Sequence, residues 1–316
     1  MENKKETVCA VVVTYNRKKL LLECLEAIRK QTRPVQGIYL IDNASTDGTP
    51  KLLLEKGYIK ELPPENLIEP WEKEFEIKNL TDGETIKLHY VRMHENTGGA
   101  GGFHEGVKRA YEKGYDWLWL MDDDAEPLKD SLYFLLKNTN FIENIGFLCS
   151  TVLFTNNQLH PANIPKIKKK EITPFLLKEC LIPVESCSFV SFVISRKIIK
   201  VVGFPLKEFF IWLNDVEYSL RISYKYKYKG FWCLPSIVIH KAYTKRKKLP
   251  PKKMYFRLRN RIISLFLDSI PIRKKIASLK VIFVSFLFLI TQREYFIAFK
   301  AIKDSFLIWN KLKKIR

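Results

Sequence analysis

The 316-residue sequence lacks the features that mark several large protein classes. It has no run of about 20 apolar residues, the length that a membrane-spanning helix needs, and the longest candidate, Val281–Ile290, is too short. Its six cysteines are scattered and form no Cys-x-x-Cys pair, so we expect reduced, mostly buried thiols. Met1–Thr7 is polar and does not resemble a secretory signal peptide. These absences predict a cytoplasmic protein.

Acidic residues are scarce in the last quarter of the chain. Residues 241–316 hold 21 Lys and Arg residues against three Asp and Glu residues, so this quarter carries +18 of the total net charge of +20. The first 240 residues are therefore nearly neutral. The basic charge belongs to the C-terminal region and gives no information about the chemistry of the preceding part.

The first part of the chain alternates between strand and helix patterns. Val8–Thr14 is apolar and β-branched, which predicts a central parallel strand, and Gly37–Ile41 predicts a second one. Apolar residues at helical spacing in Lys18–Gln31 predict a helix between them, and Thr49–Leu54 begins another, with Pro50 in its first turn. This order is typical of an α/β fold with a parallel sheet.

Two stretches break the alternation. We expect Gly57–Lys87 to be an irregular insertion with a short hairpin around Asp82 and Gly83, and Thr155–Lys178 to be a loop near the site. Further strands are expected at Lys87–Arg92, Trp117–Met121, Ile145–Phe154, Ser186–Ser195 and Gly230–Ile239, and helices at Phe103–Lys113, Leu128–Lys137 and Arg196–Val201.

Polar residues follow the first two predicted strands. Ligands of open α/β sheets sit at the carboxyl ends of the strands, which makes Asp42 and Asp47 candidates for contacts with a nucleotide base or ribose. The alternative for Asp47, which precedes Gly48, is ordinary turn chemistry. A glycine-rich segment, Glu95–Phe103, follows the third strand and precedes a helix. It matches neither a dinucleotide-binding nor a P-loop motif, but it predicts a close backbone approach to a phosphate or sugar.

The apolar run from Trp117 ends in three consecutive carboxylates, Asp122, Asp123 and Asp124. Adjacent like charges repel each other, and burial increases that repulsion. A divalent cation would relieve it, since carboxylate oxygens suit Mg²⁺ and Mn²⁺. The alternative is a solvated acidic turn.

A second polar cluster lies near residue 215. Asp215 and Glu217 stand where a helix is expected to begin, and Trp212 precedes them. The two acids either complement the helix dipole or place a carboxylate beside a substrate, where the indole offers a face for a sugar ring. His240 ends the last predicted strand. A histidine in this place is often structural, but imidazole is also a good ligand for Mn²⁺.

These residues together resemble glycosyltransferase family 2, whose members have the GT-A fold and are typically inverting. The resemblance covers about Val8–His240, and its motifs occur in the order of the family. Asn96–Gly102 and the sequence around Trp212 most resemble the bacterial galactofuranosyltransferase branch, and next the rhamnosyltransferase branch. The four motifs are Val12–Arg17, Asp42–Thr49, Asp122–Asp124, and Asp215–Glu217 with Arg221.

The resemblance implies roles for individual residues. Asp122 and Asp124 match the metal- and diphosphate-binding pair, His240 matches the histidine that completes the metal shell, and Asp215 matches the general base. The branch often has two acids after the tryptophan, whereas here Leu213-Asn214-Asp215 follows, so Glu217 stays the alternative base. The nucleotide-sugar site implied by the resemblance comprises Thr14, Asn16, Arg17, Asp42, Asn43, Asp47, Asn96, Gly98, Gly99, Asp122, Asp123 and Trp212.

The function implied is an inverting, Mn²⁺- or Mg²⁺-dependent transfer of a sugar, galactofuranose from UDP-galactofuranose, to a hydroxyl of a growing glycan. The glycan would be lipid-linked and destined for a cell-surface polysaccharide such as O-antigen or capsule. Three alternatives remain: a rhamnosyltransferase that uses a dTDP-sugar, a nucleotidyltransferase, and a membrane-associated binding protein without activity.

The basic region is expected to form a separate part of the protein, with residues 1–243 as the transferase domain and 244–316 as amphipathic helices. The helices are expected at Met254–Leu267, Ile276–Thr291 and Tyr295–Lys311. Basic residues around aromatic and aliphatic faces predict a peripheral anchor on the inner face of the cell membrane. The alternatives are a bundle that closes the domain and a homo-oligomer interface. No motif indicates nucleic-acid binding.

Overall fold

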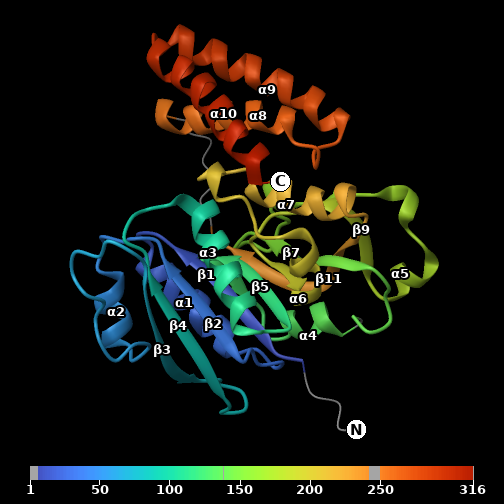
Figure 1. The fold of residues 1–316 in the computed structure, drawn as a ribbon. Coiled ribbons are helices and arrows are strands. Elements are labelled where there is room, and N and C mark those ends of the chain that lie inside the picture. The colour runs from blue at the N-terminus through green and yellow to red at the C-terminus, as the bar shows by residue number, and fades with distance from the viewer. Residues whose placement is uncertain (1–5, 138, 242–249, 316) are drawn as a thin grey trace.

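The computed structural model describes residues 6–137, 139–241 and 250–315 as one mixed sheet flanked by helices, with a group of helices at one end (Figure 1). The strand order is β3-β4-β2-β1-β5-β10-β7-β11-β9-β8, and β6 pairs with β11. The strands are β1 Val8–Thr14, β2 Gly37–Asp42, β3 Trp71–Lys78, β4 Thr85–Arg92, β5 Trp117–Asp122, β6 Ala125–Pro127, β7 Ile145–Leu153, β8 Lys166–Ile167, β9 Leu181–Ser186, β10 Phe192–Ser195 and β11 Lys229–His240.

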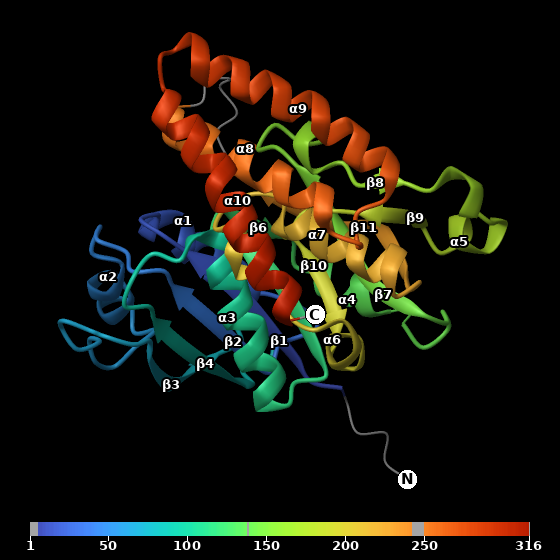
Figure 2. The same cartoon turned by 45° about the horizontal axis from the view of Figure 1, so that its top comes forward.

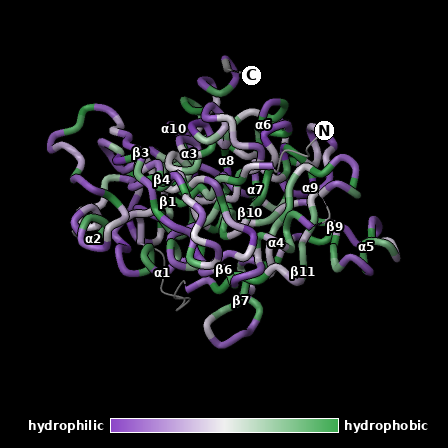
Figure 3. Tube along the Cα trace, turned by 90° about the horizontal axis from the view of Figure 1, so that it is seen from below, coloured by the Kyte–Doolittle hydropathy of each residue, from purple (hydrophilic) through white to green (hydrophobic). Residues whose placement is uncertain are grey.

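The predicted α/β architecture is confirmed in the neighbourhood of β1. Strands β4, β2, β1 and β5 are parallel, so their carboxyl ends meet at one edge. Every residue of β1 is buried, as expected for a strand covered on both faces. Beyond β5 the sheet becomes mixed, because β10 pairs antiparallel with β5 and β7. Figure 3 colours the chain by hydropathy and shows hydrophobic and hydrophilic segments interspersed along the trace.

Helices cover both faces of the sheet. Val8, Ala10 and Val12 pack in one core with α1 and α4, while Cys9 and Val11 pack in another with α3, α6 and α7. This division follows from the alternation of side chains along a strand. The helices are α1 Lys18–Arg29, α2 Thr49–Glu55, α3 Gly98–Lys113, α4 Ser131–Leu136, α5 Pro174–Lys178, α6 Arg196–Val202, α7 Asn214–Leu220, α8 Pro251–Phe266, α9 Ile272–Thr291 and α10 Tyr295–Ile315.

The glycine-rich segment differs from the prediction. Helix α3 begins at Gly98 rather than at Phe103, so the glycines form its first turns. A Cβ atom on Gly102 would lie 2.5 Å from a methyl carbon of Val13, and one on Gly106 would lie 2.4 Å from a methyl carbon of Val11. Gly102 of this segment, and Gly106 one turn further along α3, therefore serve the close packing of α3 on β1.

Two other predictions need correction. Ser186–Ser195 is not one strand, because β9 ends at Ser186 and pairs with β11, whereas β10 begins at Phe192 and pairs with β5 and β7. Thr155–Lys178 is not only loop, since it contains β8 and α5. The hairpin around Gly83 is confirmed: β3 and β4 pair antiparallel on either side of it, so part of the expected irregular insertion is an edge strand.

The C-terminal helices form a bundle that packs on the sheet domain (Figures 1 and 2). Met254, Leu258 and Leu289 belong to a core among α8, α9 and α10, and Ile263 and Leu312 join a second core with α7 and the adjoining loop. The three predicted helices are confirmed. The expected boundary at residues 243 and 244 lies outside the described residues. Where the chain is described, no helix is both long and apolar enough to cross a membrane.

Candidate active site

The pairing of β6 with β11 brings the acidic turn and His240 together. Asp122 ends β5, and the chain turns through Asp123 and Asp124 into β6, whose Ala125 lies opposite His240 of β11. The amide of Lys241 also donates to the carbonyl of Asp124 at 2.9 Å. As a result, side chains of Asp122, Asp124 and His240 offer ligand atoms that all lie within 4.8 Å of one another.

The geometry of His240 fits a cation between the two elements. Asn163 donates from its amide nitrogen to Ser188 Oγ (2.8 Å), so its oxygen, 3.0 Å from Nδ1 of His240, accepts the proton there. Nε2 of the ring lies 3.2 Å from Asp124 Oδ1. Among the described residues, this buried oxygen has no hydrogen-bond partner. A proton or a metal ion can join these two atoms, and the oxygen and nitrogen donor set suits Mn²⁺ or Mg²⁺.

The carboxylates of the turn differ in electrostatic state. Burial, reinforced by the charge of Asp124, raises the pKa of Asp122 to about 7. Burial also raises the pKa of Asp123 to about 6, although Arg17 and a hydrogen bond from Thr14 oppose it. For Asp124 the contacts with His240 and Arg17 outweigh burial and lower the pKa. Two negative charges thus accumulate at this turn only when cations compensate them.

Thr14 and Arg17 hold the end of β1 against the acidic turn. Thr14 Oγ1 donates to Asp123 at 2.7 Å, and Arg17 Nη1 donates to Asp123 at 3.1 Å and to Asp124 at 2.6 Å. The guanidinium side chain remains 49% exposed. It therefore lies at the surface of the site with part of its charge directed to solvent, where an anionic group can reach it.

Asp42 does not present its carboxylate to the surface. It is fully buried and accepts hydrogen bonds from Tyr90 (2.8 Å), Arg92 (2.7 Å) and the amide of Ser45 (2.9 Å). The expected direct contact with a nucleotide therefore finds no free oxygen on this side chain. Its position instead fixes the turn after β2.

The other polar residues of the predicted nucleotide site connect three loops. Asn16 accepts from the amides of Thr46 and Asp47, and Asp47 accepts from the amide of Lys18 and from Thr49. The Asn43 side chain joins the glycine-rich segment, since it donates to Asn96 and to the carbonyl of Gly98 and accepts from the amide of Thr97. These hydrogen bonds between side chains and main chain order the three loops at this edge of the sheet. Asp47 takes part through turn chemistry, the alternative role expected for it from the sequence.

A contact between the glycine-rich segment and the loop before α7 was not foreseen. Gly98 has φ +71°, and a Cβ atom on it would lie 2.1 Å from the carbonyl oxygen of Phe210. The amide of Ala100 donates to the same carbonyl at 3.0 Å. The glycine therefore permits close approach to another protein segment. No local sequence signal indicates which segment this is.

Asp215 and Glu217 occupy different environments. Glu217 is buried and paired with Arg221 (2.5 and 3.1 Å), and Ser269 donates to it at 2.7 Å. Asp215 is partly exposed near Trp212, whose exposed fraction is 36%. Burial raises the pKa of Asp215 to about 6, against a hydrogen bond from the amide of Val216 and the charge of Arg261. A carboxylate with a pKa of about 6 suits a base near neutral pH, and of the two acids Asp215 is the one that is partly exposed.

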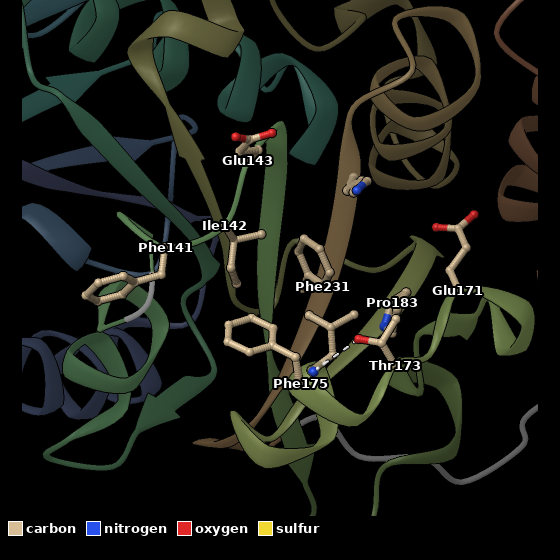
Figure 4. A pocket seen from close by; sticks show the side chains of 10 residues that line it. Phe141, Ile142, Glu143, Glu171, Thr173, Phe175, Pro183 and Phe231 are labelled. Carbon is tan, nitrogen blue, oxygen red and sulfur yellow. Dashed lines mark hydrogen bonds between the residues drawn. The ribbon is translucent and has the colours of Figure 1, made fainter.

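A separate hollow lies away from these groups (Figure 4). Its volume is about 420 Å³, and it lies between the α5 region and the strands β9 and β11. Phe175 and Phe231 face it, with Glu143 and Glu171 at its edge (Figure 4). It shares no residue with the carboxylate turn or with the loop before α7. The polar constellation at the strand ends, not this hollow, is therefore the candidate active site.

A family model described as glycosyl transferase family 2 matches residues 9–61 and 74–201, more than half of the chain. The chain belongs to glycosyltransferase family 2. It is therefore a glycosyltransferase, as the motifs predicted. The matched region includes the Asp122–Asp124 turn of this family 2 enzyme, whereas Asp215 and His240 lie beyond it.

Curated relatives agree with the predicted branch of family 2. Galactofuranosyltransferase GlfT1 of Mycolicibacterium smegmatis (strain ATCC 700084 / mc(2)155) is 33% identical over 122 residues, which is 39% of this chain and 31% of the relative. GlfT1 of Mycobacterium tuberculosis (strain ATCC 25618 / H37Rv) is 31% identical over 120 residues, 38% of this chain and 31% of the relative. The alignments thus span less than a third of these relatives.

Solved structures support the fold of the family 2 enzyme. GalNAc-T7 with UDP, GalNAc and Mn²⁺ has a TM-score of 0.56 at 15% identity, covering 82% of this chain and 48% of that chain. TarS of S. aureus has a TM-score of 0.50 at 14% identity, covering 88% of this chain and 43% of that chain. At such identities the likeness concerns the fold alone, and it confirms the predicted GT-A fold.

The burial of Glu217 generates a stability prediction. Replacing Glu217 with Ala should lower the free energy of unfolding by about 3–5 kcal/mol, because Arg221 would keep a buried charge without its partner. Urea denaturation followed by circular dichroism measures this change. Glu112→Ala, an exposed position on α3, is the control and should change stability by less than about 0.5 kcal/mol. A Glu217→Ala protein as stable as that control would argue against a structural role.

Proposed function

We propose that this family 2 enzyme transfers a sugar from a nucleoside diphosphate to an acceptor hydroxyl with inversion, assisted by Mn²⁺ or Mg²⁺. The observation that carries the proposal is the convergence of ligand atoms of Asp122, Asp124 and His240 within 4.8 Å of one another. Asp122 and Asp124 lie at the carboxyl end of β5, where open α/β sheets bind their ligands.

The proposed roles divide the site into a donor side and an acceptor side. Asp122, Asp124 and His240 hold the cation, whose chemistry when bound is to neutralise charge on the departing diphosphate. Arg17 adds a partly exposed guanidinium beside them, suited to phosphate oxygens. On the acceptor side Asp215 removes the proton of the attacking hydroxyl, a contribution of about 10²–10⁴-fold to the rate.

Polar side chains complete the proposed donor site. They order the loops that would surround the nucleotide, and they are Thr14, Asn16, Asn43, Asp47, Asn96 and the buried Asp42. A Cβ atom on Gly99, in the first turn of α3, would meet nothing within 4 Å, which leaves room for a diphosphate or sugar, whereas Gly98 contacts the loop before α7. Asp123 shapes the turn, and Trp212 offers its exposed face to a sugar ring.

Galactofuranose from UDP-galactofuranose is the proposed donor, supported by the names of the curated relatives. The proposed acceptor is a lipid-linked glycan of a cell-surface polysaccharide. A dTDP-rhamnose donor is the alternative within the family. A comparison of UDP-galactofuranose, other UDP-sugars and dTDP-rhamnose in a metal-dependent binding assay distinguishes them.

The C-terminal bundle suggests how such an acceptor is reached. On α9 and α10 the side chains of Phe283, Phe296 and Phe299 are 67%, 79% and 62% exposed, and exposed lysines such as Lys280 and Lys303 lie among them. An apolar face with basic residues fits the interface of an anionic membrane. We therefore propose that residues 244–316 dock the enzyme peripherally on the inner face of the membrane. A homo-oligomer through the same face is the competing arrangement.

Removal of a proposed ligand should affect nucleotide binding. Asp124→Ala should weaken Mn²⁺-dependent binding of UDP by about 10–100-fold, because one cation ligand and the contact to Arg17 are lost. Isothermal titration calorimetry with and without Mn²⁺ measures the effect. Asp130→Ala, an acid outside the cluster, serves as control. Equal UDP affinity of Asp124→Ala and wild type at saturating Mn²⁺ would exclude the proposed site.

The proposed base generates a kinetic prediction. Asp215→Asn should lower sugar transfer by at least about 10²-fold while UDP binding stays within about twofold, since a base acts on the acceptor and not on the nucleotide. In the wild type, transfer should rise with pH through about 6, because the pKa of Asp215 is raised to about 6 and the carboxylate must be unprotonated. Transfer by Asp215→Asn at the wild-type rate would remove the residue as base.

Membrane docking can be tested with vesicles. The double variant Phe283→Asp/Phe296→Asp should bind anionic phosphatidylglycerol vesicles at least about tenfold more weakly than wild type, because each buried aromatic side chain contributes about 1.5–3 kcal/mol. Cosedimentation measures the bound fraction. Ile68→Asp replaces another exposed apolar residue, 91% exposed and far from the bundle in sequence, and should bind normally. No binding of the wild type at low salt, or a stable dimer broken by the double variant, would refute membrane docking.

A further inference from the structure

The loop that precedes α7 has an unusual backbone. Phe210, Trp212 and Leu213 have φ values of +61°, +65° and +64°, a region that side chains other than glycine rarely occupy. The loop leads directly into Asn214 and Asp215 of α7. Such backbone persists only where the surroundings hold it in place, and the contacts of this loop therefore identify what positions the acceptor side of the site.

The side chain of Asn260 in α8 binds main-chain carbonyls of this loop. Its amide nitrogen, Nδ2, lies 2.9 Å from the carbonyl oxygen of Phe209, 2.7 Å from that of Ile211 and 3.3 Å from that of Trp212. Asn260 is fully buried. One side chain thus serves three carbonyls within four residues of the loop.

Arg259, the neighbour of Asn260, extends this contact. Its Nη2 donates to the carbonyls of Glu208 (2.7 Å) and Phe209 (2.8 Å), and its Nε and Nη2 donate to the amide oxygen of Asn260 at 3.0 and 2.9 Å. The residue is buried, and no ion pair between it and a carboxylate occurs among the described residues. A buried guanidinium is costly unless its donors are satisfied. Here two loop carbonyls accept from Nη2, and the side-chain oxygen of Asn260 accepts from Nε.

The same loop also contacts the donor side. The ring of Phe210 stacks on Phe256 of α8, with centroids 4.6 Å apart and planes 9° from parallel. Its carbonyl accepts from Ala100 in the first turn of α3. Helix α8, the loop and the glycine-rich start of α3 therefore form one continuous set of contacts across the site.

We propose that α8 completes the active centre, with Asn260 and Arg259 as positioning residues that fix the loop and thereby Trp212 and Asp215. The inference rests on the proposed role of Asp215 in sugar transfer. It assigns a function to a helix beyond residue 201, where the match to the family model ends. Small displacements of a catalytic group reduce rates strongly, so the effect should appear in turnover.

The experiment uses the full chain with two matched variants of α8. Asn260→Ala removes the donors to all three carbonyls. Ser264→Ala is the control, because Ser264 is also buried on α8 but bonds within the bundle, to the carbonyl of Arg261 and to Ser278. We expect Asn260→Ala to lower kcat by about 10–100-fold with UDP affinity within about twofold, and Ser264→Ala to match the wild type.

Hydrogen exchange supplies a readout that does not depend on transfer. Amides in residues 207–217 should exchange at least about tenfold faster in Asn260→Ala than in wild type or Ser264→Ala. Unchanged exchange in this segment overturns the inference even if no transfer assay succeeds. Suppose that wild type transfers sugar and Asp215→Asn does not. Normal turnover of Asn260→Ala would then overturn only the inference about α8 and would leave the proposed function intact.

A second pair of variants covers a failure of Asn260→Ala to fold. Arg259→Lys keeps one donor for the carbonyls of Glu208 and Phe209, whereas Arg259→Met keeps none. We expect kcat to fall in the order wild type, Arg259→Lys, Arg259→Met, with UDP affinity retained in both. The proposal would be refuted if the Arg259 variants lost UDP affinity and turnover equally and Ser264→Ala showed the same losses. That result would mean that α8 only stabilises the fold.

Discussion

Electrostatic repulsion at the end of β5 is the constraint around which the site is arranged. Asp122, Asp123 and Asp124 are consecutive, and two of them are almost fully buried. The chain supplies one partly exposed guanidinium, from Arg17, and one imidazole, from His240. These groups compensate Asp123 and one oxygen of Asp124 but leave the pKa of Asp122 raised. A site left short of positive charge in this way is prepared for a cation rather than for a closed ion pair.

On the proposed acceptor side, the energetic cost lies in the backbone of the loop before α7. Three residues with positive φ in one loop cost about 1–3 kcal/mol each, and hydrogen bonds from residues that are distant in sequence offset this cost. Asn260 and Arg259 bind the loop from α8, while Ala100 binds it from α3. The two sides of the site thus depend on different physical terms: charge compensation holds the acidic turn, and hydrogen bonds to main-chain carbonyls hold the loop.

Features of the fold and site that depend on local patterns could be predicted from the sequence. Val8–Thr14 and the start of α1 follow from apolar periodicity, and the carboxyl-end position of Asp122 follows from the strand before it. Features that depend on partners distant in the sequence could not be predicted in this way. The buried state of Asp42 depends on Tyr90 and Arg92, which lie about 50 positions away, and no local pattern encodes such a partner. The division of Ser186–Ser195 into two strands likewise depends on which neighbours each half finds in the sheet.

The contact between α8 and the loop adds detail that the composition of the C-terminal region does not contain. The excess of basic residues predicted a separate group of amphipathic helices, and in the structure Arg259 is buried against loop carbonyls, while Ile263 and Leu312 share a core with Phe209 and Leu220. The outward faces of α9 and α10 combine exposed phenylalanines with lysines. These helices therefore pack one face against the transferase domain and expose the other face to solvent. Helices α9 and α10 pack on α8, and α8 binds the loop that carries Trp212 and leads into Asp215 of α7, so packed helices connect the outer face with this part of the site.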